Sequence, residues 1–259
     1  EQIRHGIETL EAISGRFHMI ETDRFLIVDD CYNANPMSMK ASLDVLQDGL
    51  GRKVAILASV AFNSRVTLDN VHIEGITKIT AKDIRYAKEM GCEIKLLGVA
   101  RCQEDGVEAY VCPMLIPVEH PLASVNDSYN AVFVHGDAVG DTMFYGRGAG
   151  ELPTASAVVG DIIDCVKHKG TNVMVIWDDE KLTLADTSEE ERRFFVRVPA
   201  DVTEATVKEL FGDVNVVKAD GLDNEYGFVT GIMTEGKFAE AAAKVNVISR
   251  IRIDDTKLS

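Results

Sequence analysis

Glycines at positions 140, 146, 148 and 150 lie close together, just before a stretch that contains no further proline after Pro153. Glycine adopts positive φ easily and lets the backbone approach a neighbouring group. Because proline suits the first turn of a helix, the segment predicts a glycine-rich loop that opens a helix over Thr154–Val166. The N–H groups at such a helix start attract phosphates. No βαβ unit with an acidic residue about twenty positions on accompanies the loop, so it is not a dinucleotide fingerprint. The pattern alone fits a ligand-binding loop and a structural turn equally well.

The bulk composition limits the classes of partner. At 259 residues the chain has the length of about two domains and can bury a hydrophobic core. Its net charge of −15 argues against nucleic acid and anionic membrane surfaces. We find no apolar run of about eighteen residues and no basic and apolar leader, so we expect a cytoplasmic protein without a membrane partner.

The five cysteines predict no metal site. Cys92, Cys102 and Cys112 are evenly spaced, but no pair has C-x-x-C spacing and no nearby histidines complete a zinc pattern. We therefore expect buried free thiols in a reducing compartment.

Hydrophobic periodicity predicts the elements of the first half. Phe25–Val28 is a short apolar run flanked by charge, typical of a strand buried on both faces. Met37–Leu50 has apolar residues at helical spacing. Lys53–Asn63 fits a strand or a helix, and its alanine and leucine content favours the helix. A short helix over Asp83–Met90 follows, with Thr80 as N-cap and Gly91 as its stop.

Strands dominate the middle of the chain. Glu93–Arg101 and Val107–Pro113 alternate around Asp105-Gly106, which predicts a hairpin. Asn130–Gly136 and Thr142–Tyr145 predict two further strands, the second leading into the glycine loop.

The last part of the chain differs in composition and in its predicted order of elements. Residues 170–192 are polar and charged, and we expect a linker there with short strands that include Trp177. The remainder predicts strand, helix, strand, strand, helix and strand, in this order: Phe194–Val198, Thr203–Phe211, Val214–Ala219, Tyr226–Met233, Lys237–Val245 and Val247–Ile253. This βαββαβ order is that of a ferredoxin-like fold.

Six stretches of the chain carry a family resemblance. They are Lys53–Asn63, Val71–Thr80, Ile94–Ala100, His120–Val125, Asn130–Val132 and Gly146–Gly150. In this order and spacing they resemble the substrate-binding and dimerisation region of bacterial homoserine dehydrogenase, over residues 53–169. The resemblance implies NAD(P)-dependent interconversion of L-homoserine and L-aspartate 4-semialdehyde in threonine and methionine biosynthesis, by a homodimer.

The same resemblance implies roles for four residues. Lys53 matches the family lysine that carries a proton as the hydride moves. The alternative is an ordinary residue after Gly51-Arg52 with no catalytic role. The family places an Asp four residues and a Glu fifteen residues before this lysine, where this chain has Gly49 and Ser38. Gly150, with Gly148 and Glu151, matches the loop that lies against the nicotinamide cofactor. We expect the family's N-terminal Rossmann domain to be missing, so whether the chain is an enzyme by itself is open, and we expect no turnover.

A second resemblance lies upstream. Ile13–Phe17 and Leu26–Met39 resemble the C-terminal domain of the Mur ligase that adds D-alanyl-D-alanine to the UDP-N-acetylmuramoyl-tripeptide, over about residues 1–57. It implies an ATP-dependent peptide ligase fragment whose Arg16, Asp30, Asn33 and Asn35 approach ATP. The alternative is an Asx-rich turn that caps the helix near Met37. The two resemblances meet at Lys53–Leu57, so we expect a chimera.

The predicted organisation follows from these patterns. We expect an α/β (α+β) protein: a Mur ligase-like αβ fragment over 1–52, a domain with a mixed sheet over 53–169, a linker over 170–192 and a ferredoxin-like domain over 193–259. Placed after a homoserine dehydrogenase region, the last domain resembles an ACT domain, which implies an amino-acid effector. The usual Asp-x-Pro-Gly turn of that family is Pro199-Ala200-Asp201-Val202 here, so a packing module is the alternative. A non-catalytic dimerisation and effector-sensing module is the third functional hypothesis.

Overall fold

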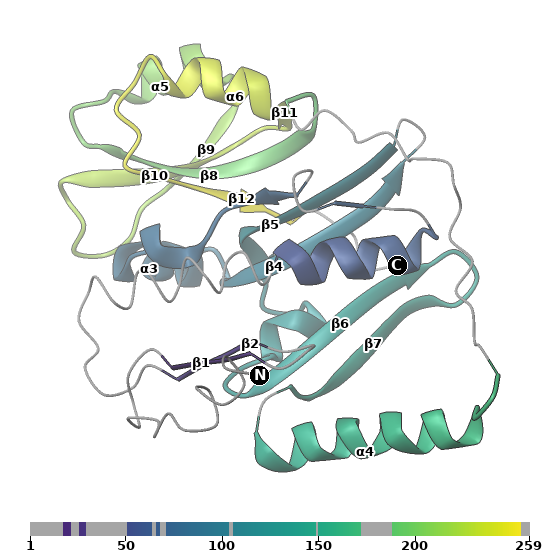
Figure 1. The fold of residues 1–259 in the computed structure, drawn as a ribbon. Coiled ribbons are helices and arrows are strands. Elements are labelled where there is room, and N and C mark those ends of the chain that lie inside the picture. The colour runs from purple at the N-terminus through teal and green to yellow at the C-terminus, as the bar shows by residue number, and fades with distance from the viewer. Residues whose placement is uncertain are drawn as a thin grey trace, which may run out of the picture.

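The computed structural model describes residues 18–21, 26–29, 51–63, 66–67, 71–103, 106–148, 150–171 and 188–254. Within these ranges the strands form one mixed sheet of eight strands and two separate two-stranded sheets (Figure 1). The mixed α/β architecture that we predicted is therefore present. Among the described helices, none is long and apolar enough to cross a membrane.

A long hairpin forms one end of the large sheet. β4 (Cys92–Gln103) pairs antiparallel with β5 (Gly106–Pro117) along its whole length, from Cys92↔Pro117 to Gln103↔Gly106. The predicted hairpin is confirmed. β5 is buried from Gly106 to Ile116, with β4 on one of its edges and two other strands on the opposite edge. These are β3 (His72–Ile73) and β12 (Ser249–Ile253), both parallel to β5.

The contested segment at the start of this region is a helix. Residues 51–61 are helical, which confirms the prediction for Lys53–Phe62. Val54, Ala55 and Ala58 are buried in a cluster with alternate residues of β5, such as Val107 and Val111. A helix is favoured here because tertiary packing on the sheet selects it from a sequence that fits either state.

A second helix covers the next part of the same sheet. α3 (Ala81–Glu89) begins at Thr80, whose side chain accepts from the Asp83 N–H while the Asp83 carboxylate accepts from the Thr80 N–H. This reciprocal pair is a capping box. The helix is followed by Gly91 at φ +64, the left-handed conformation that glycine tolerates best. Both predicted helix signals, Thr80 and Gly91, are confirmed.

The C-terminal part has the predicted βαββαβ order. Its elements are β8 (Glu191–Pro199), α5 (Glu204–Phe211), β9 (Val214–Val217), β10 (Glu225–Thr230), α6 (Glu235–Ala242) and β12. The strands lie in the antiparallel order β12-β8-β10-β9, and the short β11 (Met233–Thr234) also pairs with β8. Alternate residues of β8 face opposite ways: Phe194 packs with α5 and α6, and Phe195 packs with Tyr86 of α3.

The large sheet continues through both parts of the chain. β12 pairs antiparallel with β8 and parallel with β5, so it joins the C-terminal strands to the β4·β5 hairpin (Figure 1). The division into domains at 53–169 and 193–259 remains a prediction. The strand pairing itself is continuous across it.

The remaining described elements stand outside the large sheet. β6 (Tyr129–Gly136) and β7 (Gly140–Arg147) form a hairpin, which confirms both predicted strands. α4 (Glu151–Lys167) follows it and, although described in full, has no buried residue. Near the N-terminus, β1 (His18–Glu21) pairs antiparallel with β2 (Leu26–Asp29). The strand predicted at 25–28 thus exists, but as part of a two-stranded hairpin. The helix predicted at 37–50, the strand at Trp177 and Asp105 lie outside the described residues.

Candidate functional site

Lys53 lies on the exposed side of helix 51–61. Its neighbour Val54 points the other way and contacts Gly98 of β4, where an added Cβ would meet the Val54 side chain. The glycine therefore lets the helix lie close to the sheet, and this contact fixes the side from which Lys53 projects. The positions that would carry the family carboxylates, Gly49 and Ser38, lie outside the described residues.

The glycine loop leads from β7 directly into α4. Gly150 is the N-cap of α4 with φ +119, a conformation that favours glycine. Its carbonyl accepts from the Thr154 N–H at 3.1 Å and from the Thr154 hydroxyl at 2.8 Å. No side chain caps the start of this fully described helix, so its first N–H groups face outward beside the Glu151 carboxylate. This geometry is that of an exposed helix start with one acidic side chain.

Aromatic contacts hold the base of the loop. Tyr129 and Tyr145 stack with ring centroids 4.9 Å apart and an interplanar angle of 3°. The Arg147 guanidinium lies 5.5 Å from the centroid of the Tyr129 ring. At Gly148, an added Cβ would meet the Asn130 side chain, so the loop passes too close to β6 for a larger residue. The loop that contains Gly148 and Gly150 is therefore held by the β6·β7 hairpin.

The remaining residues taken from the two resemblances are the predicted ATP contacts and His120. Arg16, Asp30, Asn33 and Asn35 lie outside the described residues, so their predicted ATP role is untested. His120 is buried, accepts from the Leu122 N–H at 3.1 Å and packs 5.3 Å from the Phe133 ring. His120 thus serves as the cap of a short 3-10 helix (Pro121–Ser124).

The thiols differ from the prediction in one respect. Cys92, Cys102, Cys112 and Cys165 are free, as we expected, but Cys102 and Cys165 are exposed and only Cys112 is fully buried. The prediction of uniformly buried thiols is wrong, because Cys102 lies near the end of β4 and Cys165 lies on the exposed helix α4. Across the described ranges, no group of three or more His, Cys, Asp or Glu side chains is arranged to hold a metal ion.

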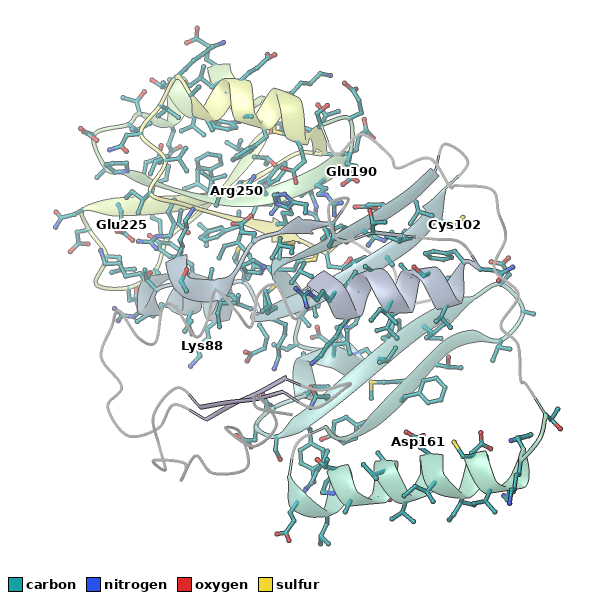
Figure 2. The ribbon with its side chains drawn as sticks, viewed as in Figure 1. Lys88, Cys102, Asp161, Glu190, Glu225 and Arg250 are labelled. Carbon is teal, nitrogen blue, oxygen red and sulfur yellow. The ribbon has the colours of Figure 1, made fainter. Side chains whose placement is uncertain are left out.

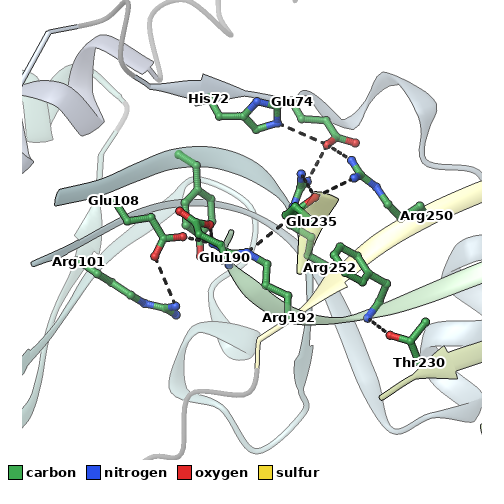
Figure 3. Close-up of polar contacts among 12 residues, drawn as sticks. His72, Glu74, Arg101, Glu108, Glu190, Arg192, Thr230, Glu235, Arg250 and Arg252 are labelled. Carbon is green, nitrogen blue, oxygen red and sulfur yellow. Dashed lines mark hydrogen bonds and ion pairs between the residues drawn. The ribbon is translucent and has the colours of Figure 1, made fainter. Parts of the chain in front are cut away.

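A buried cluster of charged residues was missed by the sequence analysis. The segment before Phe194 looked like a polar linker, yet Arg192 on β8 is buried and pairs with Glu108 of β5 and with Glu190 (Figure 3). β8 thus begins at Glu191, three residues before the predicted strand, while the linker over 170–192 stays a prediction. Alternation along the strand brings Arg192 to the buried face and leaves Glu191 exposed. A signal was present, since Arg192 lies two residues before Phe194 of the predicted strand and so shares its face, where a buried charge needs a partner.

The cluster extends to three more carboxylates. Glu235, the first residue of α6, and Glu74, which follows β3, share two arginines of β12 (Figure 3). Arg101 lies 3.5 Å from Asp254 and 3.9 Å from Glu108. Buried charges are tolerated only when they are paired, so these contacts are a condition of the fold rather than a reactive site.

A second group of charges joins α3 to the C-terminal strands. Arg197 of β8 is 2.7 Å from Asp83 and 2.7 Å from Glu225, and Lys82 is 2.8 Å from Glu225. Burial raises the pKa of Asp83, but hydrogen bonds from Thr80, Arg197 and Ser249 outweigh it and lower the pKa below the ordinary value. Asp83 thus serves both the helix cap and the contact with β8.

Comparison with known proteins finds relatives of the central region. Residues 40–163 match the family model described as homoserine dehydrogenase. The chain is 50% identical over 131 residues to the homoserine dehydrogenase of Corynebacterium glutamicum and 44% identical over 135 residues to that of Bacillus subtilis. These matches cover 49% and 52% of this chain, and 29% and 30% of the relatives.

Solved structures extend the similarity. A homoserine dehydrogenase from Thiobacillus denitrificans superposes with a TM-score of 0.69 at 31% identity, covering 79% of this chain and 52% of that one. One from S. aureus gives a TM-score of 0.62 at 32% identity, covering 80% and 52%. The chain thus spans about half the length of these solved relatives, and its central region is similar to homoserine dehydrogenases in both sequence and fold.

These comparisons also bear on the upstream resemblance. The family match begins at residue 40, inside the segment that we assigned to a Mur ligase. They support neither the Mur ligase fragment nor the chimera. The short signals on which that assignment was based, an Asx-rich stretch after an apolar strand, also occur wherever a strand is followed by a capped helix.

Proposed function

We propose that this chain supplies the substrate-binding and dimerisation part of a homoserine dehydrogenase. That enzyme interconverts L-homoserine and L-aspartate 4-semialdehyde with NAD(P) in threonine and methionine biosynthesis. The observation that carries the proposal is the match of residues 40–163 to the family, within a chain whose fold follows solved homoserine dehydrogenases.

Lys53 is the proposed proton carrier. Its ammonium group projects from an exposed helix face, where a substrate hydroxyl or carbonyl oxygen has access to Nζ. A lysine in this role needs a carboxylate to orient it and to tune its pKa. Positions 38 and 49, where the family has these carboxylates, are Ser and Gly here. We therefore infer that this chain by itself does not catalyse the dehydrogenase reaction.

The glycine loop is the proposed contact with the cofactor. When bound, NAD(P) supplies or accepts the hydride. The uncapped start of α4 offers N–H donors, while Gly148 lets the loop pass close to Asn130 and Gly150 supplies the positive φ at the helix start. Glu151 disfavours a phosphate at this point but suits the hydroxyl of a ribose. The residues present therefore fit the sugar of a dinucleotide better than its pyrophosphate.

We also propose a homodimer and a packing role for the C-terminal unit. Exposed apolar residues on β6 and β7, among them Val132, Met143 and Phe144, are suited to contact a second copy of this chain.

The order β12-β8-β10-β9 with α5 and α6 on one face supports an ACT-like assignment of the C-terminal unit. Because β12 also belongs to the central sheet, we favour packing over effector sensing. A panel of free amino acids that raised the melting temperature would favour the effector role.

The proposal is tested by ligand binding together with turnover. L-homoserine should shift the ¹H–¹⁵N resonances of helix 51–61. Lys53→Ala should reduce these shift changes more than Arg52→Ala does, a matched change at another exposed position of the same helix. Shifts confined to other parts of the chain would contradict the substrate role. NADPH oxidation with aspartate semialdehyde should stay at background, and turnover above background would contradict the inference of inactivity.

A further inference from the structure

The two parts of the large sheet meet at a short pairing. Among the described residues, β12 pairs with β5 at Arg252↔Met114 and Ile253↔Leu115, and it pairs with β8 at five positions, from Ser249↔Arg197 to Ile253↔Arg193. The backbone pairing described between the two parts is thus short, and side chains add further contacts across it.

Two carboxylates from different elements share two arginines across this meeting point. Arg250 lies 2.9 Å from Glu74 and 3.2 Å from Glu235. Arg252 lies 2.7 Å from Glu74 and 2.5 Å from Glu235 (Figure 3). We call these four residues the clasp. The clasp links β3, β12 and the first turn of α6 through four ion pairs among partly or largely buried side chains.

One side of the clasp leads directly to the helix that bears Lys53. The Glu74 N–H donates to the Val111 carbonyl at 2.7 Å, which anchors this residue beside β5. Val71 and Ile73, at either end of His72, pack in the same cluster as Val54 and Ala58. A displacement of Glu74 therefore changes the surface on which helix 51–61 rests.

The other side of the clasp belongs to the C-terminal unit. Glu235 begins α6, whose Phe238 packs on Phe194 with ring centroids 4.2 Å apart. The Arg250 guanidinium also lies 5.6 Å from the centroid of the Phe238 ring. The position of α6 is thus coupled to both arginines by charge and by packing.

We propose that the clasp is a conformational coupling device, through which the placement of α6 on β12 sets the stability of helix 51–61. Contiguous packed and ion-paired groups can carry such coupling between separate sites. That the coupled helix positions a proton carrier rests on the proposed function, whereas the coupling itself does not.

Hydrogen exchange tests the coupling on the whole chain. Glu235→Gln should raise exchange in residues 51–61 by at least about five-fold, in addition to α6 and β12. Glu240→Gln, at an exposed position of the same helix, should leave residues 51–61 unchanged. Reciprocally, Glu74→Gln should raise exchange in α6.

Each outcome decides for or against the clasp. If exchange in Glu235→Gln rises only in α6 and β12, the proposal is overturned. It is also overturned if the double variant Glu74→Gln and Glu235→Gln changes the opening free energy of residues 51–61 by the sum of the two single effects. If either variant fails to fold, Arg250→Lys keeps the charge, removes the shared guanidinium bridge and should give the same pattern in milder form. The readout does not use turnover, so it distinguishes failure of the clasp from failure of the proposed function.

Discussion

The Arg192 guanidinium lies over the Tyr110 ring, 4.4 Å from its centroid, and donates to the Tyr110 hydroxyl at 2.8 Å. These residues are 82 positions apart in the chain. The contact places a β8 arginine on the buried face of β5, beside Glu108. Burial raises the pKa of Tyr110 above its ordinary range, so the phenol remains neutral and accepts this hydrogen bond.

Removal of the Arg192 charge should destabilise the protein strongly. Arg192→Met leaves Glu108 buried without this partner, and breaking such a pair costs about 3–5 kcal/mol. Lys88→Met likewise replaces a cationic side chain with Met, but on the exposed side of α3 (Figure 2), and should alter stability by less than about 0.5 kcal/mol. Urea unfolding followed by circular dichroism measures both. Equal effects of the two substitutions would refute the structural role of Arg192.

Acid should weaken the contribution of Glu74 to stability. Burial raises the pKa of Glu74, but hydrogen bonds from His72 and Arg252 and the charges of Arg250 and Arg252 outweigh it and lower the pKa from 4.5 to about 2. A depressed folded-state pKa means that the stabilisation is present above about pH 4.5 and is lost as the pH falls toward 2. At neutral pH it amounts to on the order of 3 kcal/mol at most.

Glu74→Gln provides the comparison for this pH dependence. The difference in unfolding free energy between the native chain and Glu74→Gln should be constant from pH 7 to pH 5 and should shrink between pH 4.5 and pH 2. A difference that persists unchanged at pH 2 would show that charge at Glu74 is not the source of the stabilisation.

Gly98 should tolerate no side chain. An added Cβ would meet Val54 of helix 51–61, so Gly98→Ala should cost about 1–3 kcal/mol and displace the helix. Gly146→Ala is the matched control, because nothing lies within 4 Å of a Cβ at Gly146. Thermal unfolding of both variants checks this. A neutral Gly98→Ala would mean that the helix does not lie this close to β4.

The proposed dimer should depend on the β6·β7 hairpin. Phe144 is 68% exposed on β7, and Phe144→Asp should weaken association by at least about ten-fold, since charged residues are unfavourable at the centre of an interface. Val139→Asp, at the tip of the hairpin where Val139 is 78% exposed, should have little effect. Sedimentation at micromolar concentration measures both. A native chain that sediments as a monomer would contradict the dimer itself.

Local signals were sufficient for most individual elements. Thr80 and Gly91 delimited α3 because the cap and the left-handed residue act within a turn of the helix. The β4·β5 hairpin and the βαββαβ order likewise followed from alternation and helical spacing, which depend on neighbours a few residues away. The roles of Lys53 and of the glycine loop came from the family resemblance and stay predictions.

Only the tertiary structure decided which distant elements share a sheet and which charges are buried. The sequence of residues 51–61 allowed a strand or a helix, and packing of Val54 and Ala58 on β5 selected the helix. Arg192 looked like part of a solvated linker, because its partner Glu108 lies 84 positions earlier. No local sequence pattern predicts that β12 pairs parallel with β5. Hydrophobic burial and ion pairs between residues far apart in the sequence determine this pairing.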